Sequence, residues 1–236
     1  GGAVALATTA CGGPMQAGAA AVVQGQRTSD REVQSEVASY VTLAEANGGP
    51  AAGTVTDQER AALAKAQINF LVQRALWQKV ADDLGLKVGP DADAKVSSDQ
   101  VKKARSALGP QFHGSDDEAV AVAIAQSQNP NGLSPSLVPA YVHRQALIQA
   151  VIDDQAAKLK VAPDTQDPAA ASALEKAIIP LLDKAAKEVD IKISPRYGAF
   201  DSSQRALVAA DTSWIRPTTA QLDKALQQMQ QQPQQQ

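Results

Sequence analysis

Residues 189–201, VDIKISPRYGAFD, differ in pattern from the rest of the chain, which is mostly rich in Ala, Gln, Lys and Glu at helical spacing. Apolar Ile191 and Ile193 stand on either side of polar Lys192. Alternation of this kind over a few residues is typical of a half-buried β-strand. Because the backbone N–H and C=O groups of a strand need partners, this segment must pair with a second strand elsewhere in the chain.

The partner strand is expected near the start of the chain, in residues 19–26, AAAVVQGQ. Val22 and Val23 are β-branched, and β-branched side chains favour strands. No other segment of the sequence has a comparable strand pattern. We therefore predict that a strand around Val22 and Val23 pairs with the strand around Ile191 and Ile193.

Between these two strands the sequence repeatedly marks the start of a helix. In a capping box, a Ser or Thr and a Glu or Gln three residues later satisfy two backbone donors reciprocally. Four segments fit this pattern: Ser29-x-x-Glu32, Thr56-x-x-Glu59, Ser97-x-x-Gln100 and Ser115-x-x-Glu118. They predict helices over about 30–46, 57–84, 98–108 and 116–127. Apolar spacing predicts a helix over 137–160, and Asp167-Pro168 predicts one to about 189 with Pro180 inside it.

Composition limits the classes of fold and function. The chain has 236 residues, of which 44% are hydrophobic and only 3% aromatic, so the core must consist mainly of Ala, Val, Leu and Ile. Such small side chains favour closely packed helices in one domain. The formal net charge is −3 and the basic residues are dispersed, so we expect no nucleic-acid partner. No internal run of about 20 apolar residues predicts a transmembrane helix.

The first residues resemble the end of a bacterial lipoprotein signal. The chain begins GGAVALATTACGG without an initiator Met, which we interpret as a cut inside a longer precursor. Small apolar residues lead to Cys11, the only cysteine, which cannot form an internal disulfide. Thr9-Ala10-Cys11 resembles a lipobox, although Thr8 stands where Leu is usual. The resemblance implies acylation of Cys11 and a membrane tether; the alternative is an unmodified cysteine in a signal remnant.

The sequence carries no recognisable catalytic or metal-binding pattern. His113 and His143 are the only histidines, and neither has a cysteine, a second histidine or a carboxylate at ligand spacing, so we expect no metal site. A Gly-rich phosphate loop and a nucleophile elbow are both missing. Adjacent carboxylates such as Asp116 and Asp117 would point about 100° apart on a helix. We therefore predict no cofactor and no enzymatic activity.

The order of the predicted pieces resembles the N-terminal chaperone domain of the SurA and PrsA foldase family, in particular the actinobacterial lipoproteins with such a domain. Its motifs are the helix end ADDLGLKV (81–88), with Gly85 in its turn, a cap at Ser98-Asp99, and the late phrase SPRYGAFD (194–201). The resemblance covers about 19–202 and implies a mainly α fold. In it, a helical chaperone domain is closed by a short β pair between the N-terminal and C-terminal strands.

The late phrase contains Pro195, Arg196, Tyr197 and Gly198. We expect Arg196 to bind a carboxylate or helix carbonyls and Gly198 to supply a backbone angle that other residues avoid. The alternative is that Arg196 and Tyr197 line a ligand site. The family often carries a parvulin-type prolyl isomerase domain, but KVAPDTQD (160–167) leaves no room for one between the last two long helices.

The resulting domain plan has three parts. Residues 1–18 are a signal remnant with the lipobox cysteine and a flexible spacer, 19–203 form the chaperone domain, and 204–236 are an extension with a disordered Gln-rich tail. The resemblance implies an extracytoplasmic, membrane-tethered holdase that binds unfolded polypeptides without ATP and without isomerase activity. The alternative is a structural or adaptor lipoprotein of the cell envelope that binds one specific partner, with Trp214 and the tail as contacts.

Three aromatic residues are possible contacts for unfolded clients, namely Phe70, Trp77 and Tyr141. All three fall on predicted helices, where aromatic residues more often pack in the core. They are candidates for client binding if the fold exposes them together.

Overall fold

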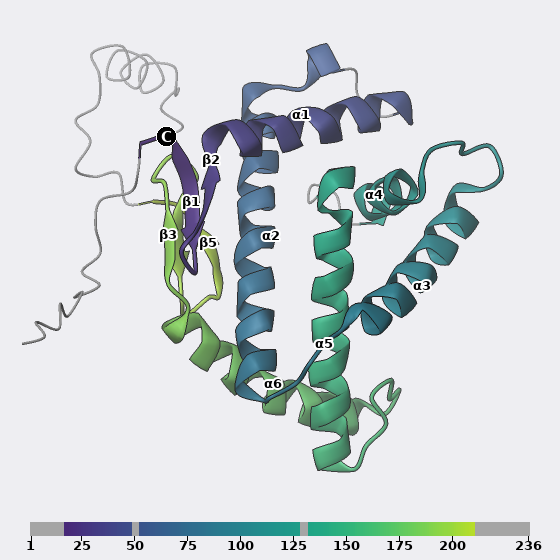
Figure 1. The fold of residues 1–236 in the computed structure, drawn as a ribbon, viewed down its shortest axis with the longest axis vertical. Helices are drawn as coiled ribbons and strands as arrows, with labels where there is room; N and C mark the ends of the chain where they lie inside the picture. The colour runs from purple at the N-terminus through teal and green to yellow at the C-terminus, as the bar shows by residue number, and fades with distance from the viewer. Residues whose placement is uncertain (1–16, 49–51, 128–131, 211–236) are drawn as a thin grey trace, which may run out of the picture.

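The computed structural model describes residues 17–48, 52–127 and 132–210, and within these ranges the chain is mainly helical with small antiparallel sheets (Figure 1). The α-helices are α1 (Asp30–Ala46), α2 (Asp57–Asp83), α3 (Pro90–Leu108), α4 (Asp116–Ser127), α5 (Val138–Leu159) and α6 (Pro168–Glu188). The strands are β1 (Ala19–Val23), β2 (Gln26–Ser29), β3 (Ile191–Ile193), β4 (Ala199–Asp201) and β5 (Ala206–Val208). Short 3-10 turns, η1 (Ala52–Thr54) and η2 (Pro135–Leu137), precede α2 and α5.

The long helices α2 and α5 lie side by side in the middle of the molecule (Figure 1). Helix α1 crosses near the start of α2, and α6 packs against the lower parts of both α2 and α5. Helices α3 and α4 pack on each other on the α5 side, whereas the strands lie on the opposite side of α2. In the described part of the chain, none of the helices is long and apolar enough to span a bilayer.

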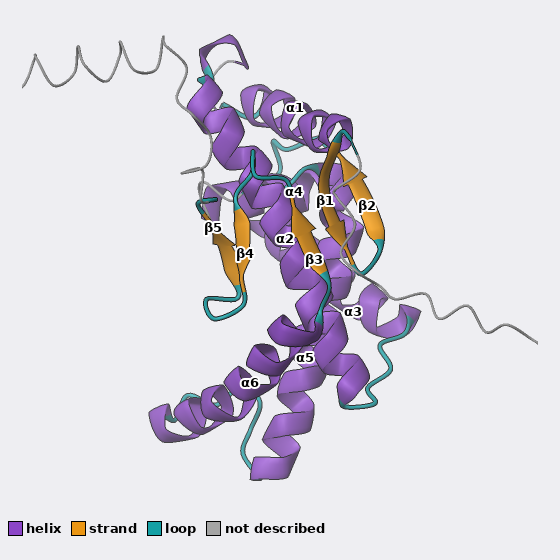
Figure 2. Ribbon diagram, turned by 90° about the vertical axis from the view of Figure 1, so that its left-hand side faces the viewer, coloured by secondary structure: helices purple, strands orange, loops and turns teal. Residues whose placement is uncertain are grey.

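The predicted pairing of the two ends of the domain is confirmed. Strand β1 lies between β2 and β3 and is antiparallel to both, so the sheet order is β2-β1-β3 (Figure 2). Val22 is opposite Lys192, and Val23 is opposite Ile191. Beyond the sheet, the Ser194 N–H donates to the Ala20 carbonyl at 2.9 Å. A strand made late in the chain therefore completes a sheet begun at its start.

Helix α2 supplies side chains to all three clusters of the hydrophobic core. Phe70 packs with α3, α4 and α5, and Ile68 packs with α1 and the sheet. Further along α2, Leu76 packs with α5 and α6. Most of the fully buried side chains are Val, Ala, Leu or Ile, as the composition predicts. The circumference of α2 is therefore largely covered, and the elements around it are positioned by contact with this one helix.

Three of the four predicted capping boxes are present. The backbone N–H groups of Glu32, Glu59 and Glu118 donate to the hydroxyl oxygens of Ser29, Thr56 and Ser115, respectively, each at 3.2 Å. The three glutamates in turn accept from the backbone N–H of that Ser or Thr. This acceptance lowers the pKa of the Glu32 and Glu59 carboxyls.

The stop at the end of α2 also follows the prediction. Gly85 has a φ of +69°, and the Leu86 N–H donates to the Ala81 carbonyl at 2.9 Å. The Gly85 N–H donates to the Asp82 backbone carbonyl at 3.0 Å, which completes a Schellman motif. The predicted apolar residue after the glycine, Leu86, packs against the core cluster of α2 and α6.

The predicted helix start at Ser97 is wrong. Helix α3 begins at Pro90 with Gly89 as its N-cap, so Ser97 lies inside a helix that is already under way. Proline is well suited to the first helical position because its missing N–H would have no partner there, and Asp91 in the first turn complements the helix dipole. The Ser98-Asp99 phrase that contributed to the family resemblance therefore does not cap a helix here.

Three strands were not predicted. Strand β2 follows a two-residue turn after β1, and β4 pairs with β5 in a separate hairpin. The β4–β5 hairpin crosses the domain boundary placed after residue 203, and Leu207 beyond that boundary is buried. The Gln73 side chain on α2 donates to the Arg205 carbonyl at 2.5 Å, which fixes the hairpin to the helix. Cys11, Trp214 and the Gln-rich tail lie outside the described residues.

Candidate binding cleft

The three aromatic residues considered for client binding are not exposed together. Phe70 and Tyr141 are 7% and 8% exposed, and the Arg144 guanidinium lies over both rings, 4.8 and 5.4 Å from their centroids. Burial lowers the pKa of Arg144. Trp77 is half-buried and packs against a different cluster. The three side chains pack against the core, so the condition set for client binding, that the fold exposes them together, is not met.

The Pro195–Gly198 phrase has a structural role. Tyr197 is 6% exposed and accepts a hydrogen bond from the Gln34 side chain at 3.3 Å, and burial raises the pKa of its hydroxyl. Gly198 has a φ of +121°, so the predicted unusual backbone angle is confirmed. Arg196 is exposed, and its guanidinium lies 5.6 Å from the Tyr197 ring centroid. The prediction that it binds a carboxylate or helix carbonyls is wrong within the described residues, where it has neither partner.

A cleft of about 620 Å³ opens between the β1–β2 hairpin and the helices α2 and α5. It is larger than the cavity of about 110 Å³ beside Phe70 and Tyr141. The hairpin contributes Val23, Gln24, Gln26, Arg27 and Thr28; α2 contributes Leu71, Arg74, Ala75, Gln78, Lys79 and Asp82; α5 contributes His143. The α2 residues recur at intervals of three and four, so they lie on one face of the helix.

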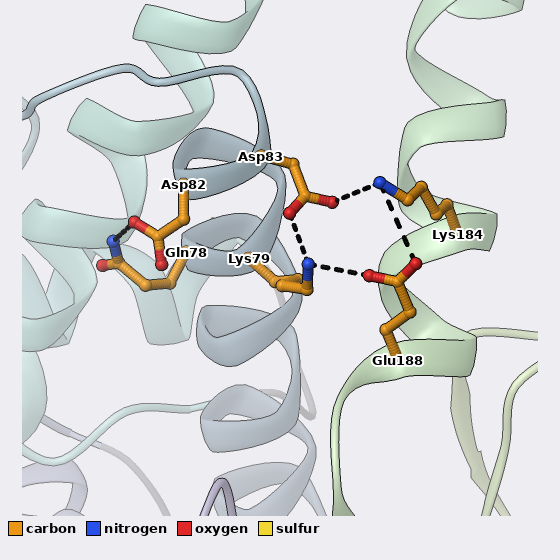
Figure 3. A network of polar contacts seen from close by, with 6 residues as sticks. All are labelled: Gln78, Lys79, Asp82, Asp83, Lys184 and Glu188. Atoms are coloured by element: carbon orange, nitrogen blue, oxygen red, sulfur yellow. Dashed lines mark hydrogen bonds and ion pairs between the residues drawn. The ribbon is translucent and has the colours of Figure 1, made fainter.

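Most charged groups of this cleft already have partners. Lys79 pairs with Asp83 and, at 2.7 Å, with Glu188 on α6, and Lys184 donates to Asp83 at 2.9 Å (Figure 3). These hydrogen bonds raise the pKa of Lys79 and lower the pKa of Asp83. Asp82 accepts from the Gln78 amide at 2.9 Å. The network joins α2 to α6 beside the cleft.

His143 borders the cleft and connects three helices. Its Nδ1 atom is 3.0 Å from both carboxylate oxygens of Asp93 on α3, and its Nε2 atom is 3.3 Å from the Gln78 Oε1 atom on α2. Sequence spacing missed the carboxylate beside His143 because Asp93 is 50 positions away. The described ranges contain no group of three or more His, Cys, Asp or Glu side chains placed to hold a metal ion.

Arg74 is the exception among the cations that line the cleft. It is half-buried, and within the described part of the chain it makes neither a hydrogen bond nor an ion pair. Arg27 also borders the cleft, but its guanidinium donates to the Ala17 carbonyl at 3.3 Å. Neither arginine has a carboxylate partner among the described residues, and Arg74 is the one of the two that also lacks a hydrogen bond.

Strand β2 forms one edge of the sheet (Figure 2). It also forms one border of the cleft. The turn at Gln24–Gly25 leaves Val23 opposite Gln26, and residues flanking a two-residue hairpin turn exchange hydrogen bonds. Backbone groups of alternate residues point to opposite sides of a strand. The N–H and C=O groups of Arg27 therefore point away from β1, toward the open edge.

The side chains of β2 also alternate between two faces. Directly opposite residues of an antiparallel pair lie on the same face, so Gln26 lies with Val23 and Thr28 lies with Ala21. Ala21 is fully buried and Val23 packs against the core. Gln26 and Thr28 therefore face the helices, whereas Arg27 lies on the opposite face. None of these cleft features was predicted from the sequence.

The chain matches no protein-family model, and no curated protein or solved structure is significantly similar to it. The resemblance to the SurA and PrsA chaperone domain therefore stays a prediction. The geometry of the cleft remains as the basis for a functional proposal. It combines an open strand edge, a partly apolar helix face and the half-buried Arg74, which has no partner among the described residues.

Proposed function

We propose that this protein is an ATP-independent holdase that binds extended segments of unfolded polypeptides in the cleft between β2 and α2. The observation that carries the proposal is the open edge of β2 along a cleft of about 620 Å³. An extended peptide that adds to a sheet edge gains main-chain hydrogen bonds whatever its sequence. Recognition of this kind suits a protein that must accept many clients.

The apolar part of the cleft is small, which suits transient binding. Half-buried Leu71 and Ala75 on α2 and Val23 on β1 lie along it. Burial of one or two client side chains contributes roughly 1.5–3 kcal/mol each, and the ordering of the client offsets much of this gain. Weak, reversible binding needs no nucleotide to release the client.

The membrane-tethered, extracytoplasmic location is part of the same proposal. It rests on the lipobox-like sequence at Cys11, which lies outside the described residues. Strand β1 begins a few residues after Cys11, at Ala19. A lipid on Cys11 would therefore hold the sheet and its cleft near the membrane surface. The proposal assigns no catalytic step and no cofactor to the protein.

The experiment that tests the holdase function is light scattering of a chemically denatured model protein diluted with and without the 236-residue chain. We expect suppressed aggregation at near-stoichiometric ratios and no acceleration of proline-limited refolding. Two substitutions at one position test the role of the edge. Arg27→Pro removes the outward N–H and should abolish suppression, whereas Arg27→Ala keeps the backbone donor and should retain it.

Two results would contradict the proposal. If the unaltered chain gives no suppression, general holdase activity is excluded, and an adaptor that binds one envelope partner becomes the better hypothesis. If Arg27→Pro suppresses aggregation as well as Arg27→Ala while both remain folded by circular dichroism, the edge of β2 is not the binding site.

A further inference from the structure

We infer that the cleft selects extended segments in which an acidic side chain binds Arg74, so that its occupants are acid-bearing rather than purely apolar strands. This inference rests on the proposed function and adds the chemistry of the bound segment. It starts from the half-buried side chain of Arg74 on α2 and the open edge of β2 opposite it.

The surroundings of Arg74 leave its charge without a counterion. Asp82 is the only carboxylate among the described cleft-lining residues, and its carboxylate already accepts from Gln78. The two nearby carboxylates, those of Asp83 and Glu188, form ion pairs with Lys79. A partly buried charge is more favourable when it is paired. An incoming carboxylate would therefore be stabilised at Arg74 more than at a fully solvated arginine.

Two other half-buried arginines show the pairing that Arg74 lacks, whereas a third, Arg144, lies over the Phe70 and Tyr141 rings without a carboxylate partner. Arg105 holds Asp116 at 2.7 Å, and Arg205 holds Asp183 at 2.7 Å. In both cases the carboxylate comes from a different secondary-structure element or its flank. A peptide laid along β2 would supply the equivalent carboxylate to Arg74 from another chain.

The geometry of strand addition places the required side chain. Residues of an added strand that lie opposite Gln26 and Thr28 would share their face and point toward α2. That face carries Arg74 together with Leu71 and Ala75. An acidic residue followed two positions later by an apolar residue would therefore bring a carboxylate to Arg74 and an apolar side chain to the neighbouring helix surface. A guanidinium binds such a carboxylate in a bidentate fashion.

Fluorescence anisotropy with three labelled peptides tests this inference on the full 236-residue chain. The peptides are eight-residue sequences of alternating Thr and Val in which one central Val is replaced by Glu, Gln or Lys, so that the residue two positions later is Val. We expect the Glu peptide to bind about tenfold more tightly than the Gln peptide, the ratio for one charge-assisted hydrogen-bonded contact, and the Lys peptide to bind most weakly. The ratio should fall when the salt concentration rises.

Variants assign the preference to Arg74. Arg74→Gln should bind the Glu and Gln peptides equally, and Arg74→Glu should prefer the Lys peptide. Arg31→Gln, which removes an exposed arginine of α1 outside the cleft, is the matched control and should retain the tenfold ratio. Circular dichroism confirms that each variant is folded.

The outcomes separate this inference from the proposed function. Equal binding of all three peptides, abolished by Arg27→Pro, would overturn the inference and leave the holdase function intact. No binding of any peptide would overturn both. If sedimentation shows a dimer that Arg27→Pro dissociates, the edge of β2 is occupied by a second copy, and the inference is overturned.

Discussion

Gly198 gives the most direct test of how the β4–β5 hairpin is held. Its φ of +121° lies in a region that residues with a side chain rarely adopt, and such strain costs about 1–3 kcal/mol. A Cβ atom at this position would also lie 2.3 Å from the Val208 carbonyl oxygen. Val208 is the strand partner of Ala199, the residue after Gly198, so this oxygen cannot move without displacing the strand pair.

Forced displacement of packed groups costs typically another 1–3 kcal/mol. Gly198→Ala should therefore lower the free energy of unfolding by about 2–6 kcal/mol, measured by urea denaturation followed by circular dichroism. Gly85→Ala is the matched control, because Gly85 also has a positive φ but no atom lies within 4 Å of its would-be Cβ. We expect that control to lose only about 1–2 kcal/mol.

The difference between the two variants reports the contact with Val208 together with the greater backbone strain at Gly198. If Gly198→Ala and Gly85→Ala lose the same free energy, the close approach of Gly198 to β5 does not exist and the reasoning is refuted.

The helix starts and the α2–α6 network give two further predictions. Ser115→Ala should lower the free energy of unfolding by about 1 kcal/mol because it removes a helix cap. Ser97→Ala, inside α3, should be neutral or slightly stabilising. Equal losses of the two variants in urea denaturation would contradict the start of α3 at Pro90. Lys79 and Lys184 hold the pKa of Asp83 below its ordinary 3.8, so the stability that Asp83 provides is present above about that pH and is lost as the pH falls through the lowered folded-state pKa. Asp83→Asn should therefore lower the melting temperature at pH 7 and weaken its decline below pH 4, and an unchanged acid profile would show that the network is not formed in solution.

Sequence patterns predicted the parts of the fold that depend on near neighbours. A capping box needs only four consecutive residues, so Ser29, Thr56 and Ser115 identified helix starts correctly. The same pattern failed at Ser97 because it cannot report that a helix is already running from Pro90. The β1–β3 pair was predictable because each strand carries an apolar pattern and needs a partner.

Other features depend on residues that only the fold brings together. Strand β2 has the polar sequence QRTS and is extended because it pairs with β1, not because of its own pattern. Whether Arg74 has a counterion depends on the partners of the nearby carboxylates. Asp82 accepts a hydrogen bond from Gln78, and Asp83 pairs with Lys79. The pairing of His143 with Asp93 likewise requires α3 to pack across α5.

The position of β1 between β2 and β3 has a consequence for synthesis. A ribosome completes β1 and β2 first, but β3 emerges only after the six α-helices of the described residues. An isolated two-stranded hairpin is marginally stable in water, and pairing of segments so distant in the chain forms slowly. We therefore expect the β1–β2 hairpin, and with it the edge of β2, to be stably formed only at the end of translation. A chain that stops before Ile191 would keep much of its helical part but would lack the strand that supports the cleft.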